Sequence, residues 1–186
     1  RDIVKGLLEF SRETEFTLKP TNLAGLIEKS VRLVASQVPA GITVEQDAPP
    51  DLTVPLDGQR MQEVLLNLVI NATQAMDPGP GTVTLSARAE PGCGQAVIRV
   101  RDTGPGIRPE HLGHIFDPFF TLKDVGKGTG LGLSVAFGIV KKHGGSITAE
   151  NAEGGGAEFV IRLPLGTAPG TGSEPESCPG PEEEEA

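Results

Sequence analysis

The sequence predicts an α+β fold of two layers, in which a mixed, mostly antiparallel sheet carries helices on one face. In each half of the chain, apolar residues at helical spacing precede runs rich in β-branched residues. Turns rich in glycine and proline join consecutive β runs, which indicates hairpins. Because a helix with one apolar stripe must bury it, the helices are expected to pack against the sheet.

Three helices are predicted in the first half of the chain. The stretch RDIVKGLLEFSRE carries one apolar stripe, but a helix this short is marginal unless it packs against a partner. Asn22 is the candidate N-cap of a second helix, which begins at LAGLIEK. Asp57 is the candidate cap of a third helix at about residues 58–76.

The strands are predicted from short runs of β-forming residues. GITVEQDA indicates a strand, whereas APPDLTVPLD indicates a proline-broken edge strand or a loop. GTVTLSARAE and GQAVIRVRD follow the third helix, and the turn PGCG between them predicts a hairpin.

The last third of the sequence begins with a long turn-rich region, from Thr103 to Gly130. A helix is predicted from Leu131 to His143, because Gly144 is a typical helix terminator and basic residues occupy the last turn. A second hairpin around AEGGG is expected to close the sheet.

Composition limits the classes of function. The chain has 186 residues and a formal charge of −9, and its last 21 residues hold six glutamates with no lysine or arginine. That tail, residues 166–186, is predicted to be disordered. The rest of the chain is not basic, which disfavours nucleic-acid binding, and no apolar run approaches the roughly 20 residues of a membrane span. The two cysteines, Cys93 and Cys178, have no metal-ligand spacing.

Three polar residues form a stripe on the third helix. Glu63, Asn67 and Asn71 are spaced four residues apart, so they lie on one face among otherwise apolar neighbours. A carboxylate and two amides supply oxygen atoms suited to Mg²⁺ and its waters. The alternative is that the asparagines simply bind backbone groups or neighbouring side chains.

Asp102 ends a predicted strand and begins the turn DTGPGI. A carboxylate at such a place can accept a hydrogen bond from an exocyclic amine, and the two glycines allow the backbone to approach a flat ring. An ordinary Asp-initiated turn is the alternative.

The stretch GKGTGLGLS, residues 126–134, is a candidate phosphate loop. Its spacing fits neither the P-loop nor the dinucleotide-binding pattern. It nevertheless places backbone N–H groups at the start of a helix, with Lys123 and Lys127 nearby, and both features favour anions. A flexible surface loop is the alternative.

Taken in order, the motifs NLVINA, DTGPGI, FDPFFTLK, GKGTGLGLS and GGGAEF resemble the N, G1, F and G2 boxes and the final strand of sensor histidine kinases. The resemblance runs from about Thr21 to Leu165 and is greatest to the nitrogen-regulation type. It implies a Bergerat-type α/β sandwich, shared with the ATPase domains of gyrase and MutL. The implied domains are residues 1–16 (the end of a dimerisation-hairpin helix), 17–165 (the catalytic ATP-binding domain) and 166–186 (the acidic tail).

The resemblance also implies roles for individual residues. Asn71 would ligate Mg²⁺, with Asn67 and Glu63 supporting the metal side. Asp102 would accept the adenine amino group. Gly104, Gly106 and Ile107 would shape the base pocket. Residues 116–123 would belong to the ATP lid, in which Lys123 would reach for phosphate. The phosphates would be surrounded by the glycine loop, namely Lys127, Gly128, Thr129, Gly130, Leu131 and Gly132.

Two departures from the family pattern affect the chemistry. Ala157 occupies a position where family members often carry threonine, so fewer polar contacts to the base are expected beside Asp102. Gyrase-type ATPases carry a glutamate four residues before the metal-binding asparagine, where this chain has Asn67. An amide cannot take a proton from water, which favours phosphotransfer over hydrolysis.

The three histidines, His111, His114 and His143, lack the context of a phosphoacceptor. The HxxH pair lacks a third metal ligand, and His143 is expected to end a helix. No catalytic residue is therefore expected in this chain, which would not phosphorylate itself and would be a piece of a longer protein.

The expected function is the ATP-binding catalytic domain of a two-component sensor histidine kinase, with ATP and Mg²⁺ as cofactors. Its expected partners are the dimerisation domain of the same kinase and a response regulator, without nucleic acid or membrane contact. The expected location is cytoplasmic, with any membrane segment in the parent protein. An anti-sigma-factor-type serine kinase, a nucleotide-sensing module without kinase activity and a hydrolytic ATPase are the alternatives.

Overall fold

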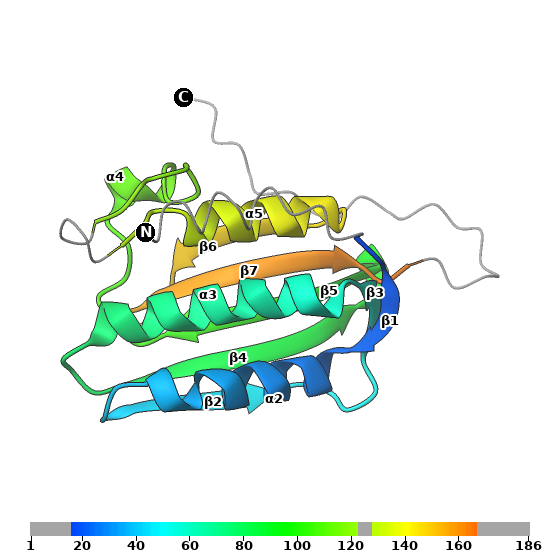
Figure 1. Cartoon of the computed structure of the whole chain (residues 1–186), viewed down its shortest axis with the longest axis horizontal. Helices are drawn as coiled ribbons and strands as arrows, with labels where there is room; N and C mark the ends of the chain where they lie inside the picture. The colour runs from blue at the N-terminus through cyan, green and yellow to red at the C-terminus, as the bar shows by residue number, and fades with distance from the viewer. Residues whose placement is uncertain (1–15, 123–127, 167–186) are drawn as a thin grey trace.

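The computed structural model describes residues 16–122 and 128–166, and its main feature is a five-stranded sheet covered on one face by three helices (Figure 1). The strand order is β2-β4-β5-β7-β6; β2 runs parallel to β4, and the other neighbours are antiparallel. The strands are β2 (Ile42–Asp47), β4 (Gly81–Glu90), β5 (Gln95–Asp102), β6 (Ser146–Asn151) and β7 (Ala157–Pro164). The covering helices are α2 (Leu23–Val34), α3 (Gly58–Met76) and α5 (Gly132–Lys142). The predicted α+β class, the mixed sheet and the two layers are confirmed.

A second sheet has two strands and includes the first strand of the described residues. Its strands β1 (Lys19–Asn22) and β3 (Thr53–Leu56) are antiparallel. The proline-containing segment thus forms a short strand, as one of the two predictions had it. Three short helical turns complete the structure, namely η1 (Ala35–Gln37), η2 (Pro91–Cys93) and α4 (Pro109–Leu112). The last of these was not predicted and lies in the turn-rich region.

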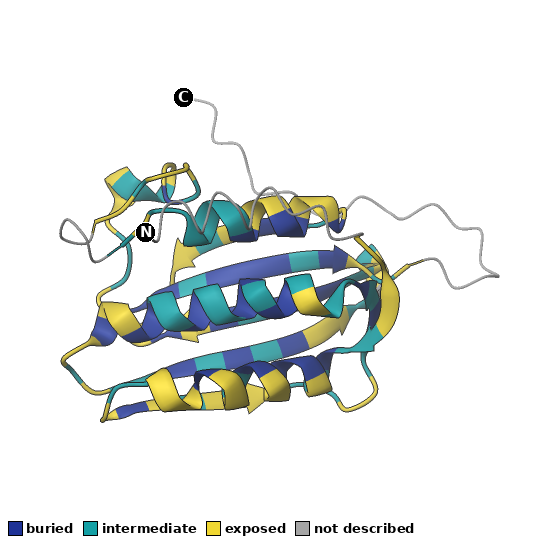
Figure 2. Cartoon of the chain, in the orientation of Figure 1, coloured by how far each residue is buried: buried dark blue, intermediate teal, exposed yellow. Residues whose placement is uncertain are grey.

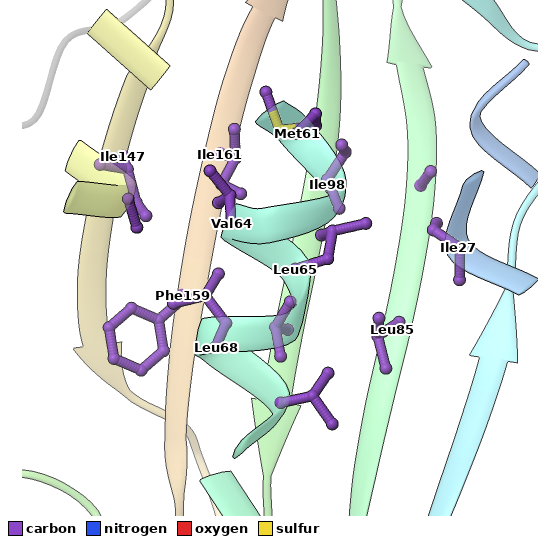
Figure 3. Packing of buried hydrophobic residues seen from close by; sticks show 14 of the residues in the cluster. Ile27, Met61, Val64, Leu65, Leu68, Leu85, Ile98, Ile147, Phe159 and Ile161 are labelled. Atoms are coloured by element: carbon purple, nitrogen blue, oxygen red, sulfur yellow. The ribbon is translucent and has the colours of Figure 1, made fainter. Parts of the chain in front are cut away.

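The hydrophobic core lies between the three helices and the sheet. Buried residues form a stripe on each helix and alternate along β4, whereas β5 and β7 each contain three consecutive buried residues (Figure 2). Figure 3 shows the centre of this core, where side chains of α3 face those of β4, β5 and β7. Met61, Val64, Leu65 and Leu68 of α3 are completely buried. Their burial holds α3 against the sheet and thereby orients the polar face of the helix.

Both predicted N-caps are confirmed. The Asn22 Oδ1 accepts a hydrogen bond from the Gly25 N–H at 2.8 Å, and the Asp57 Oδ1 accepts from the N–H groups of Gln59 and Arg60 at 3.1 and 3.0 Å. These bonds satisfy backbone donors that have no partner within the helix. α3 spans the predicted residues, and α5 ends one residue before its predicted end.

Several predictions lie outside the described residues. They concern the whole predicted helix RDIVKGLLEFSRE, the acidic tail beyond Gly166, Lys123 and Lys127. Within residues 16–122 and 128–166, no helix combines the length and apolar character that a membrane crossing requires.

Candidate functional site

A cavity of about 530 Å³ lies at the C-terminal end of α3, where this helix, the end of β5 and the start of α5 come together. Predicted site residues from separate parts of the sequence meet in its wall, namely Asn67, Asn71, Asp102, Gly106, Ile107, Gly128, Thr129, Gly130 and Gly132. Apolar side chains make up much of the remaining wall, which suits a flat aromatic ring. They include Ile70, Ile115, Leu133 and Phe159.

α3 contributes the amide side of the cavity. Asn67 and Asn71 both line the cavity, and the Asn67 Nδ2 donates to the Gly132 carbonyl oxygen at 3.4 Å. Glu63, one turn earlier, is not among the lining residues; its carboxylate pairs with the Arg60 guanidinium at 3.4 Å and is 42% exposed. The structure therefore brings two of the three stripe residues to the site, and a metal role for Glu63 remains a prediction.

Asp102 is the buried carboxylate of the site, with 3% of its surface exposed. Its Oδ1 accepts hydrogen bonds from the Gly104 N–H at 2.8 Å and the Ala157 N–H at 3.2 Å. Neither bond engages Oδ2, so one oxygen anchors the side chain and the other can receive a ligand. Gly104 does not line the cavity but holds this anchor. Ala157 stands where family members often carry threonine. Its backbone N–H still donates a hydrogen bond to Asp102, which its methyl side chain cannot do.

Two glycines bring backbone segments into contact where a side chain would not fit. Gly130 has φ +65°, and a Cβ there would lie 2.6 Å from the Phe119 carbonyl oxygen. The Phe119 N–H donates to the Gly130 carbonyl at 2.9 Å, and Phe119 itself has φ 68°. This contact joins Phe119, which lies within the predicted lid (residues 116–123), to the glycine loop. Phe120, Thr121 and Leu122 of the same lid line the cavity.

The start of α5 faces the same cavity. Its N-cap residue, Leu131, makes no side-chain capping bond to the helix and is not in the cavity lining, whereas Gly132 is. A Cβ on Gly132 would lie 3.8 Å from the Asn67 side chain, which is an ordinary van der Waals distance. The first N–H groups of α5 therefore lie beside the amides of α3, and together they form a site suited to an anion.

Two positioning residues were not predicted from the sequence. Asn151, at the end of β6, binds the backbone of Ile107 through both atoms of its amide. The His143 Nε2 accepts from the Asp57 N–H at 2.9 Å, while its Nδ1 faces the Ile139 carbonyl oxygen at 2.8 Å. His143 is thus the C-cap of α5, a helix-end position as predicted, and it also joins that end to the start of α3. Neither long-range contact has a signal in the local sequence.

The HxxH pair is not assembled into a metal site. The His114 Nδ1 lies 2.9 Å from Asp117 Oδ2, and the His111 ring lies against Phe120 at a centroid distance of 5.5 Å. Within the described residues, no group of three or more His, Cys, Asp or Glu side chains could hold a metal ion.

Comparison with known proteins identifies the family of this chain. The model of the family described as histidine kinase-, DNA gyrase B-, and HSP90-like ATPase matches residues 56–167. The sensor histidine kinase ZraS of Salmonella typhi is 39% identical over 165 residues, which cover 88% of this chain and 35% of ZraS. The chain thus spans about a third of the length of that relative.

Solved structures agree with this result. The catalytic domain of the histidine kinase ThkA matches with a TM-score of 0.71 and 33% identity, covering 80% of this chain and 95% of that domain. ThkA in complex with the response regulator TrrA matches at 0.73 and 31%, covering 89% and 47%. Full-length ShkA in complex with AMPPNP matches at 0.77 and 30%, covering 90% and 36%. The chain therefore belongs to the histidine kinase-, DNA gyrase B-, and HSP90-like ATPase family, and within it to the catalytic domains of sensor histidine kinases.

Proposed function

We propose that this chain binds Mg·ATP in the cavity and presents the γ-phosphate to a histidine on a dimerisation helix that is not part of residues 17–165. The observation that carries the proposal is the meeting of three kinds of group in one cavity: the α3 amides, the anchored Asp102 carboxylate and the start of α5. The AMPPNP complex of ShkA supports a nucleotide as the ligand.

Asp102 would recognise the base. Because Oδ1 is held by two backbone donors, Oδ2 has a defined direction and can accept from the exocyclic amine of adenine. Gly104 orients this carboxylate, while Gly106 and Ile107 line the same end of the cavity. The apolar lining would pack against the faces of the ring.

The residues on the other side fit a phosphate chain with a divalent cation. The oxygen atoms of Asn67 and Asn71 are hard neutral ligands, which suits Mg²⁺ held jointly by protein and phosphate oxygens. Such an ion would neutralise charge on the phosphates. The N–H groups at the start of α5, with Gly128, Thr129, Gly130, Leu131 and Gly132, would wrap the phosphates, and Lys123 and Lys127 would add positive charge.

The contribution of this chain to phosphotransfer would be positioning and charge stabilisation rather than acid–base chemistry. Asn67 is hydrogen-bonded to Gly132 and cannot accept a proton from water. The nucleophile would therefore be the imidazole of the dimerisation domain. A response regulator would then receive the phosphate, and the complex of ThkA with TrrA supports this partner.

The test is to incubate the chain with γ-labelled ATP, alone and with the histidine-bearing dimerisation hairpin of the parent protein. We expect acid-labile label on the added hairpin and none on this chain. A hairpin with its phosphoacceptor replaced by alanine is the control. Stoichiometric label on this chain alone, or release of free phosphate without transfer, would contradict the proposal.

A further inference from the structure

The side chain of Asn151 is hydrogen-bonded to the backbone of Ile107, which forms part of the cavity wall near Asp102. Asn151 is not among the residues that line the cavity, but Ile107, its partner, is. The Asn151 Oδ1 accepts from the Ile107 N–H at 2.7 Å, and the Asn151 Nδ2 donates to the Ile107 carbonyl oxygen at 2.8 Å. Two bonds to one residue determine both the position and the rotation of that part of the backbone.

The same support extends to the neighbouring glycine. A Cβ on Gly106, which has φ +75°, would lie 2.6 Å from the Asn151 Oδ1 and 3.3 Å from the Gly156 carbonyl oxygen. At Gly156, a Cβ would overlap the carbonyl of Asp102. Residues 102–107 and the turn between β6 and β7 are therefore in direct backbone contact.

The hydrogen bonds of residues 103–107, here named the Asp102 loop, fall into two groups. At its start, the Thr103 N–H donates to Thr82, and the Gly104 N–H donates to Asp102. At its end, within the described residues, both bonds to Ile107 come from Asn151. Removing Asn151 would therefore release the end of the loop and leave the Asp102 anchor in place.

We propose that Asn151 is a positioning residue that holds the Asp102 loop in the conformation that receives the nucleotide base. The proposal rests on the nucleotide site proposed above. It predicts an effect confined to the base, because within the described residues the side-chain hydrogen bonds of Asn151 go to Ile107, and not to the α3 amides or the start of α5. A residue needed only for folding would weaken binding of every part of the nucleotide alike.

The test compares two Asn→Asp variants of the full 186-residue chain. Asn151→Asp keeps an acceptor for the Ile107 N–H but sets a carboxylate oxygen against the Ile107 carbonyl. Asn22→Asp is the matched control, because the Asn22 amide also accepts from a backbone N–H and donates to a backbone carbonyl, that of Pro50 at 2.6 Å, but it does not line the nucleotide cavity. The Mg²⁺ complexes of ADP and tripolyphosphate are titrated against a fluorescent ATP analogue.

We expect Asn151→Asp to weaken ADP binding about tenfold, since one hydrogen bond is replaced by an unfavourable contact. Tripolyphosphate binding should stay within twofold of the wild type, and Asn22→Asp should change neither. Hydrogen exchange at the Ile107 amide should accelerate in Asn151→Asp. Asn151→Ser introduces no charge. If the aspartate variant fails to fold, we expect the same changes in binding and exchange from the serine variant.

Equal losses for ADP and tripolyphosphate would overturn the inference, as would unchanged ADP binding with unchanged exchange at Ile107. Either result would leave the nucleotide site intact, because the wild type would still bind ADP. A wild-type chain that binds no ADP would instead refute the proposed function, and this inference with it.

Discussion

Replacing Asp102 by asparagine separates recognition of the base from folding. The Asp102 Oδ1 accepts from the N–H groups of Gly104 and Ala157, and an amide oxygen can accept both bonds in the same place. These two donors therefore orient the new amide so that its NH₂ group replaces Oδ2. The variant should fold with a loss of only about 1 kcal/mol from weaker, uncharged hydrogen bonds.

The effect on binding follows because a hydrogen-bond acceptor, Oδ2, is replaced by a donor, the NH₂ group. The adenine amine would meet an NH₂ group in place of a carboxylate oxygen, and a hydrogen bond to a charged group contributes about 1.5–3 kcal/mol. ADP affinity should therefore fall about ten- to hundredfold. Inosine diphosphate carries an oxygen where adenine carries the amine, so the new NH₂ group can donate to it.

Isothermal titration of Asp102→Asn with both diphosphates measures this change. The ratio of the two affinities should move toward inosine diphosphate by at least about tenfold. Asp47→Asn, at an exposed carboxylate that pairs with Arg88, is the control and should leave the ratio unchanged. An equal loss for both nucleotides, or no loss for ADP, would refute the role of Oδ2.

Three further predictions concern the glycine contact, the helix junction and the amides. Gly130→Ala should weaken ADP binding and lower stability by about 1–3 kcal/mol in urea unfolding, since a side chain at φ +65° would also meet the Phe119 carbonyl. His143→Ala should cost about 1–3 kcal/mol in the same assay, because the Asp57 N–H loses its acceptor. Asn71→Ala should abolish the gain in ADP affinity that Mg²⁺ gives and leave Mg²⁺-free binding unchanged, as titrations with and without EDTA can measure.

Each of these has a control in the same chain. A Cβ on Gly113 would meet no atom within 4 Å, so Gly113→Ala should not destabilise the fold. The His114 side chain is 64% exposed, and its replacement by alanine should cost less than about 0.5 kcal/mol. Destabilisation equal to that of Gly130→Ala or His143→Ala would contradict the two stability arguments. A Mg²⁺ effect that survives Asn71→Ala would contradict the third.

Local patterns in the sequence predicted most of the helices and strands. Asn22 and Asp57 are capping residues that precede apolar residues at helical spacing, and this information is complete within a few positions. The polar stripe of α3 was also predicted, but the part of it that reaches the site was not. Each turn of a helix advances about 5.4 Å, so Glu63 lies two turns from Asn71 and beyond the cavity.

Contacts between distant segments could not be predicted in this way. β1 forms because Lys19–Asn22 pairs with Thr53–Leu56, and nothing within those four residues indicates the partner. The bond between Asn151 and Ile107 and the bond between His143 and Asp57 likewise join residues far apart in the sequence. An asparagine at a strand end and a histidine at a helix end are common, so their roles appear only once the partners are known.

The described wall of the cavity also bears on which reaction the site can support. Its carboxylate, Asp102, lies at the end of β5 and spends Oδ1 on two backbone donors. On the side of α5, the cavity presents the amides of Asn67 and Asn71, and Asn67 already donates to Gly132. Activation of water needs a group that accepts its proton beside the phosphate, and an amide cannot do so. The residues of this wall therefore agree with the proposed transfer of the phosphate to an imidazole of another domain.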